Sequence, residues 1–201
     1  MSLEKAKTLL WADYFIYALT DPRELFRLIK SGNGGIILVS FSVPALVVIA
    51  DILALSILRE ATGFFYYRVS YGWILIFIYA VVKIAVYSSL IDTVSQFMGY
   101  PGRIKELIAA VGFSLFPKVF ILPAVYFFSL ISFAPAFFYV FITFLLFIWH
   151  VMVLVQCISE MHSIDFGKAF SIYIIPGIVT AVALFFMFII IVIAGAGLLF
   201  G

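Results

Sequence analysis

Five ionisable side chains lie inside long apolar stretches of the chain, and their types could support ion or proton movement. They are Asp51, Lys83, Asp92, Lys118 and His150. Ionisable groups at membrane depth are costly and usually face the interior of a helix bundle, where they often mark an ion or proton pathway. The alternative is a set of structural ion pairs that fix the order of the helices. Depths counted at about 1.5 Å per helical residue predict two polar layers, Asp51 with Lys118 or Lys83, and Asp92 with His150.

Other combinations of reactive side chains are weaker. Glu160 and His162 are spaced as an acid–base pair, but they lie at a predicted helix end, where a solvated cap is the simpler interpretation. His150 and His162 are twelve residues apart, with no second ligand at helical spacing for a metal. The sequence contains no HExxH, no GxSxG and no phosphate-binding glycine loop. We therefore predict a non-enzymatic protein without catalytic residues, metal site or cofactor.

The elements that must position these residues are five apolar stretches. They cover residues 34–58, 72–97, 107–132, 134–158 and 169–200. Each has about 25 residues or more, and a helix of about 20 residues crosses the hydrocarbon core. Because lipid offers no hydrogen bonds, long spans of this kind are expected to be helical. With 66% hydrophobic and 11% charged residues, the sequence predicts an all-α, polytopic integral membrane protein with one five-helix bundle over residues 34–201.

Prolines interrupt three of the stretches, at Pro44, at Pro117 with Pro123, and at Pro176. A proline inside a helix removes a backbone hydrogen bond and tends to kink the helix. Because Lys118 follows Pro117 directly, we expect its ammonium to reach carbonyls that the kink frees.

Residues 1–33 precede the first stretch and are expected to form short amphipathic helices at the membrane interface. Asp21, Pro22 and Glu24 have the spacing of a capped helix start. Beyond them, apolar and basic residues fall on different helix faces: Leu25, Leu28 and Ile29 on one, Arg23, Arg27 and Lys30 on another. Such helices are drawn to anionic headgroups. Here they would cover the cytoplasmic mouth of the bundle or, alternatively, offer a docking platform for a protein partner.

Lysine and arginine are distributed unevenly between the two sides of the predicted bundle. Eight fall in segments on the side of the N-terminus and two on the other side. The positive-inside rule then places the N-terminus in the cytoplasm and the C-terminus outside, as an odd number of spans requires. The net charge of +2 and the scattered cations argue against nucleic acid as a partner. Small residues at 194–197, with Gly201 four residues on, permit close helix approach and leave homo-oligomer formation open.

Residues 149–178 resemble the hairpin that is typical of the Yip1 family. In that family a tryptophan-bearing helix ends in a polar turn around a histidine, and Gly-Lys-Ala opens the last helix ahead of a proline. The matching residues here are Trp149, Glu160, His162, Gly167, Lys168, Ala169 and Pro176. The segments DPRELFRLIKSG (21–32) and SLFPKVFILP (114–123) also resemble prokaryotic members.

The resemblance implies five spans, a cytoplasmic N-terminus and an outer C-terminus. Eukaryotic members are small Golgi and endoplasmic-reticulum proteins that bind prenylated Rab GTPases and assist vesicle traffic. Their longer cytoplasmic domain carries a motif that is not visible in residues 1–33. We therefore expect a short prokaryotic-type member in the plasma membrane, whose cytoplasmic face interacts with protein or lipid partners. The alternative is a small ion- or proton-linked transporter or channel that uses the five buried ionisable residues.

Overall fold

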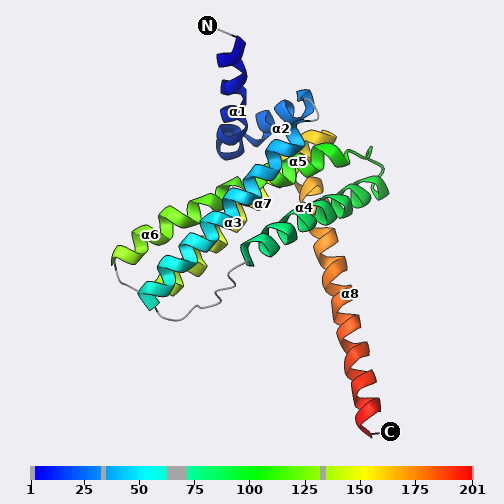
Figure 1. Cartoon of the computed structure of the whole chain (residues 1–201). Helices are drawn as coiled ribbons and strands as arrows, with labels where there is room; N and C mark the ends of the chain where they lie inside the picture. Colours follow the sequence, from blue (N-terminus) through cyan, green and yellow to red (C-terminus); the bar gives the residue numbers. More distant parts are fainter. Residues whose placement is uncertain (1–2, 33–34, 63–71, 132–134, 201) are drawn as a thin grey trace.

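A computed structural model describes residues 3–32, 35–62, 72–131 and 135–200, and these residues form helices joined by short turns (Figure 1). In chain order the helices are α1 (Leu3–Thr20), α2 (Pro22–Ser31), α3 (Gly35–Thr62), α4 (Gly72–Phe97), α5 (Ile104–Ser114), the 3₁₀ helix η1 (Phe116–Phe120), α6 (Ile121–Ile131), α7 (Pro135–His162) and α8 (Phe166–Phe200). No strand occurs in these residues. The predicted all-α class is confirmed.

Five helical segments are long and apolar enough to cross a membrane. They are Gly35–Leu58 in α3, Ile74–Phe97 in α4, Ile104–Leu130 through α5, η1 and α6, Ala136–His162 in α7, and Phe166–Ile193 in α8. Each exceeds the roughly 20 residues that a spanning helix needs. The protein is therefore a multi-pass integral membrane protein, as predicted, with separate third and fourth spans.

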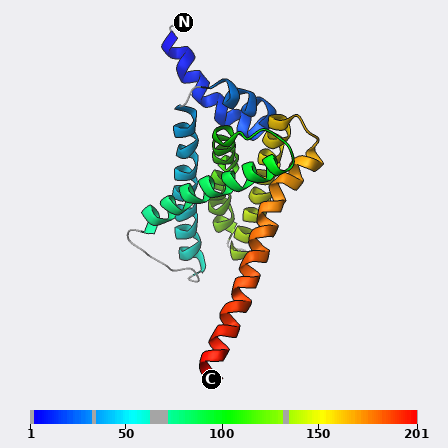
Figure 2. The same ribbon diagram turned by 90° about the vertical axis from the view of Figure 1, so that its right-hand side faces the viewer.

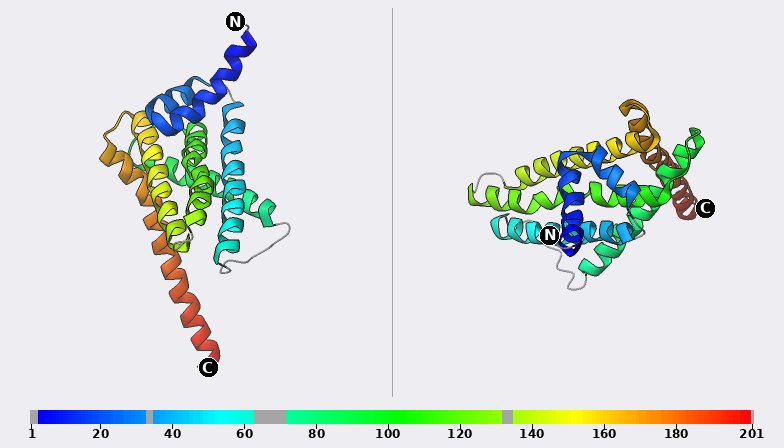
Figure 3. Two further views of the ribbon diagram at one scale, coloured as in Figure 1. Left: turned by 90° about the vertical axis from the view of Figure 1, so that its left-hand side faces the viewer. Right: turned by 90° about the horizontal axis from the view of Figure 1, so that it is seen from above.

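Three of the five spans form the core of the bundle. The helix α3, the α5–η1–α6 span and α7 run side by side (Figures 2 and 3), and each contacts the other two. Their facing sides bury large apolar side chains completely, among them Val43, Phe113 and Leu154. The other two spans are peripheral, because α4 crosses the bundle obliquely and α8 runs away from it (Figures 1 and 2).

The backbones of α3 and α5 come unusually close at Gly112. A β-carbon on Gly112 would lie 2.9 Å from both the β-carbon and the carbonyl oxygen of Ser40. Ser40 is itself fully buried. Only glycine fits without a shift, because small residues are what allow two spanning helices to approach this closely.

The third span changes its helical geometry around Pro117, where α5 gives way to η1 and then to α6. Proline lacks a backbone N–H, so the span loses one helical hydrogen bond there. By contrast, α3 and α8 continue as α-helices through Pro44 and Pro176.

The short helix α2 closes one end of the bundle, which we call the capped end. Its N-cap is Asp21, whose Oδ1 accepts hydrogen bonds from the backbone N–H groups of Arg23 (3.1 Å) and Glu24 (3.3 Å). The helix packs on α5 and α7. Its buried side chains are Leu25, Phe26 and Ile29. The apolar face of α2 is therefore buried against the protein, and its position at the membrane interface stays a prediction.

Candidate functional site

Four of the five predicted ionisable residues come together near the middle of the bundle, and we call them the midspan cluster. Asp51 comes from α3, Lys83 from α4, Lys118 from η1 and His150 from α7. The Lys118 ammonium interacts electrostatically with both the Asp51 carboxylate and the Lys83 ammonium. The His150 ring interacts with Lys118 and Lys83. Of the two partners predicted for Asp51, Lys118 or Lys83, the structure places Lys118 within reach of the carboxylate.

The carbonyl group that the helix break beside Lys118 frees is hydrogen-bonded by a different side chain from the one predicted. In η1 the backbone N–H of Lys118 donates to the carbonyl of Leu115 (2.9 Å), which releases the Ser114 carbonyl from the usual i→i−4 bond. The Nδ1 of His150 lies 2.9 Å from that carbonyl oxygen. Because a carbonyl oxygen only accepts, Nδ1 must carry the proton. His150, 7% exposed, thus occupies the role that we predicted for Lys118.

Asp92 lies apart from the midspan cluster, on the last part of α4, and it bonds the turn between α4 and α5. Its Oδ1 accepts a hydrogen bond from the backbone N–H of Arg103 (2.7 Å), and its Oδ2 accepts one from Nε2 of Gln96 (2.7 Å). The predicted layer of Asp92 with His150 is therefore wrong. The physical reason is the oblique course of α4 (Figure 1), because depth counted along a slanted helix does not give position in the bundle. Asp92 instead holds a turn that contains Gly99 with φ of 87°.

The residues of the predicted 149–178 hairpin lie along α7, the α7–α8 turn and α8. Trp149 stacks on Phe120 of η1, with ring centroids 6.3 Å apart. The start of α8 is capped by Asp165, whose Oδ2 accepts from the backbone N–H of Lys168 (3.0 Å), next to Gly167. Ala169 is fully buried and Pro176 lies within α8.

Glu160 and His162 do not form an acid–base pair. Glu160 accepts a hydrogen bond from Nε of Arg27 on α2 (3.3 Å), and Arg27 also pairs with Glu24. The hydrogen bond to Glu160, followed by the charges of both carboxylates, raises the pKa of the Arg27 guanidinium above its usual value. The His162 ring lies against Tyr100, with centroids 5.2 Å apart. Both contacts tie separate segments together at the capped end.

Comparison with protein-family models decides the family. The Yip1 domain matches residues 16–188, which is most of the chain. The chain belongs to the Yip1 family. Comparisons with curated proteins and with solved structures found no match.

In this Yip1 domain most contacts at the capped end could not be predicted from the sequence. Arg27 and Glu160 are 133 residues apart, and the cation stripe of α2 was the one available signal. The lone cysteine, Cys157, is fully buried, and its Sγ lies 3.4 Å from the carbonyl oxygen of Pro22 at the start of α2. Cys157 is thus covered by the cap.

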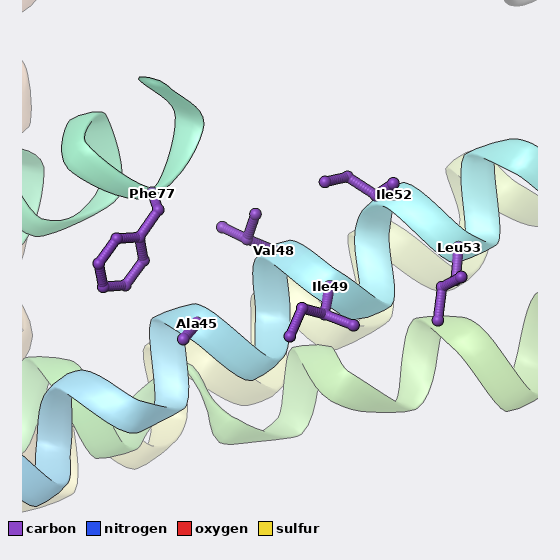
Figure 4. A pocket seen from close by; sticks show the side chains of 6 residues that line it. All are labelled: Ala45, Val48, Ile49, Ile52, Leu53 and Phe77. Carbon is purple, nitrogen blue, oxygen red and sulfur yellow. The ribbon is translucent and has the colours of Figure 1, made fainter. Parts of the chain in front are cut away.

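Two apolar grooves mark the membrane-facing surface of the Yip1 domain. The first, of about 390 Å³, lies between α3 and α4 (Figure 4). It is lined by Ala45, Val48, Ile49, Ile52, Leu53 and Phe77. The second lies between α4 and α8, near Phe97 and Pro176. The midspan cluster lines neither groove.

Proposed function

We propose that this Yip1-family protein is non-enzymatic and acts by holding a protein or lipid partner at its capped end. The observation that carries the proposal is the attachment of α2, which packs on α5 and α7 and is tied to α7 by the Arg27–Glu160 pair. A surface built in advance loses little conformational freedom when a partner binds.

The two turns at the capped end support the same proposal. The Tyr100–His162 contact joins the α4–α5 turn to the α7–α8 turn, so segments from three parts of the chain form one face. Exposed cations stand on each of them, namely Arg23, Arg27 and Lys30 on α2, Lys105 beside the first turn and Lys168 beside the second. Exposed cations on a preassembled face suit an anionic partner surface and speed its encounter.

The capped end, on this proposal, faces the cytoplasm of a prokaryotic cell, with the protein in the plasma membrane. Its support is the excess of lysine and arginine on that side. Single cysteines at Lys30 and at Glu60, two residues beyond the end of the first span at Leu58, test the orientation in a Cys157→Ser background with an impermeant maleimide on intact cells. Labelling at position 60 alone is expected, and labelling at position 30 alone would reverse the assignment.

The transport alternative is not favoured. It would require the five ionisable residues to share one water-accessible path, but Asp92 is bonded at the α4–α5 turn. Neither described groove is lined by any of the five.

Photo-crosslinking in native membranes tests the interaction role. A photoreactive residue replaces Lys30 at the capped end or, as a control position, Phe127 on α6. We expect a discrete adduct from position 30, and we expect it to weaken when Arg23 is changed to Gln but to persist with the charge-retaining Arg23→Lys. Identical adducts from both positions, or an adduct unaffected by Arg23→Gln, would contradict the proposal.

A further inference from the structure

The midspan cluster contains more cationic than anionic groups. The cluster holds two ammonium groups, Lys83 and Lys118, and one carboxylate, Asp51, which interacts with Lys118. The fourth member, His150, uses Nδ1 for the Ser114 carbonyl and adds no negative charge. With both lysines protonated, the cluster therefore carries a net positive charge inside the apolar spans.

The one carboxylate does not neutralise either lysine by direct contact. Among the described residues, the ion pairs are those of Arg27 with Glu24 and Glu160 and of Lys168 with Asp165, all at the capped end. An unpaired ammonium at membrane depth costs several kcal/mol unless an anion or water reaches it. The excess of positive charge in the cluster therefore favours the binding of an anion.

The cluster is also open to a ligand from the membrane. The Lys83 side chain is exposed, and Asp51 and Lys118 are half-buried. Asp51 lies seven residues before Leu58, where its span ends, which is about 10 Å along a helix. An extended lysine side chain directs its ammonium toward the headgroup region, and the bilayer thins locally around charges at such a depth, which brings the phosphate closer.

The α3–α4 groove lies next to Asp51 on α3. Val48, which lines the groove, is three residues before Asp51, and residues at that spacing are neighbours on a helix surface. All six lining side chains are apolar, and they come from α3 except for Phe77, which comes from α4 (Figure 4). The groove thus gives a hydrocarbon chain a place to lie beside the cations.

We propose that the midspan cluster binds the phosphate of an anionic phospholipid, with one hydrocarbon chain of that lipid in the α3–α4 groove. The proposal goes beyond a partner at the capped end and does not depend on it. A phosphodiester carries one negative charge and strong acceptor oxygens, which match the excess ammonium. Lysine serves as a point charge for such a group. A free inorganic anion lacks the chain that would occupy the groove.

Native mass spectrometry of the full chain from mixed micelles tests this proposal. The probes are phosphatidylglycerol and phosphatidylcholine with the same chains, and the measurement is the ratio of their one-lipid adducts. The wild type should prefer phosphatidylglycerol. Lys83→Gln with Lys118→Gln should lower that preference by about 25-fold, at about fivefold per lysine, which corresponds to about 1 kcal/mol each. Lys83→Arg with Lys118→Arg is the matched control and should retain the preference.

A variant that keeps both lysines provides a second test in case the double variant does not fold. Asp51→Asn removes the competing carboxylate and should raise the preference for phosphatidylglycerol by a few-fold. Unchanged adduct ratios in the Gln double variant and in Asp51→Asn would overturn the proposal. Displacement of the lipid by millimolar inorganic phosphate would also overturn it, because the site would then select a free anion. Resistance to phosphate supports the lipid.

Discussion

Replacing Gly112 by alanine should separate α3 from α5 and destabilise the bundle. The new β-carbon would lie 2.9 Å from the Ser40 β-carbon, 2.9 Å from its carbonyl oxygen and 3.0 Å from its Oγ. Ordinary contact begins at 3.4 Å, so the neighbouring helix must move by about half an ångström. Two of the contacted atoms are fixed to the α3 backbone, and rotation of the Ser40 side chain cannot relieve them.

The expected magnitude follows from comparison with a second glycine. Overpacking of this kind costs about 1–3 kcal/mol, while alanine in place of glycine favours a helix by about 1 kcal/mol. Gly177 on α8 has no atom within 4 Å of the position that a β-carbon would take. Gly177→Ala should therefore change stability only through the higher helix propensity of alanine. Gly112→Ala should therefore be less stable than Gly177→Ala by about 1–3 kcal/mol.

Reversible unfolding of the full chain by sodium dodecyl sulfate, followed by circular dichroism, provides the measurement. Ser40→Gly should rescue Gly112→Ala only in part, because the Ser40 carbonyl oxygen remains in place. Equal stability of the two alanine variants would refute the close approach of α3 and α5.

Three further predictions concern the capped end. Asp92→Ala should lower the free energy of unfolding by about 1–3 kcal/mol, because hydrogen-bond donors at the α4–α5 turn lose their acceptor. Asp92→Asn should lower it less, and the same unfolding assay checks both variants. Glu160→Gln should increase the rate at which maleimide labels Cys157, but by a few-fold at most, because an exposed ion pair is weak. Added salt should reduce the difference in rate from wild type. Equal rates at low salt would show that the Arg27–Glu160 pair does not hold α2 in place. Burial raises the pKa of the Tyr14 hydroxyl from its usual 10.0, so its contribution to stability is complete below about pH 10 and is lost as pH rises through the folded-state pKa. Melting curves across that range should show a smaller alkaline loss for Tyr14→Phe than for wild type.

The spans could be predicted from the sequence because apolar length is a property of each segment by itself. The break at Pro117 could be predicted for the same reason, since the missing N–H acts locally. The proximity of Asp51 and Lys118 followed from depth, because α3 and the third span both run along the bundle.

Contacts set by tertiary packing could not be predicted in this way. The slant of α4 carries Asp92 to the turn and away from His150, and no local pattern encodes that slant. The partner of the freed Ser114 carbonyl also depends on how the helices pack, because His150 on α7 lies opposite the break. Likewise, Tyr100 and His162 meet only because two distant turns lie at one end.

The exposed C-terminal part of α8 has a consequence for the membranes in which this protein can reside. The 35 residues of α8 span about 50 Å at 1.5 Å per residue, well beyond a hydrocarbon core of about 30 Å. From Val179 to Ile193 its side chains are exposed, apart from the half-buried Ile189, and the helix extends clear of the bundle (Figure 3). A helix that is longer than the bilayer is thick accommodates the difference by tilting. The first part of α8 packs on α4 and α7, so bending or tilting of the stretch from Val179 onward is what would match thinner and thicker bilayers with little change in the packing of the core.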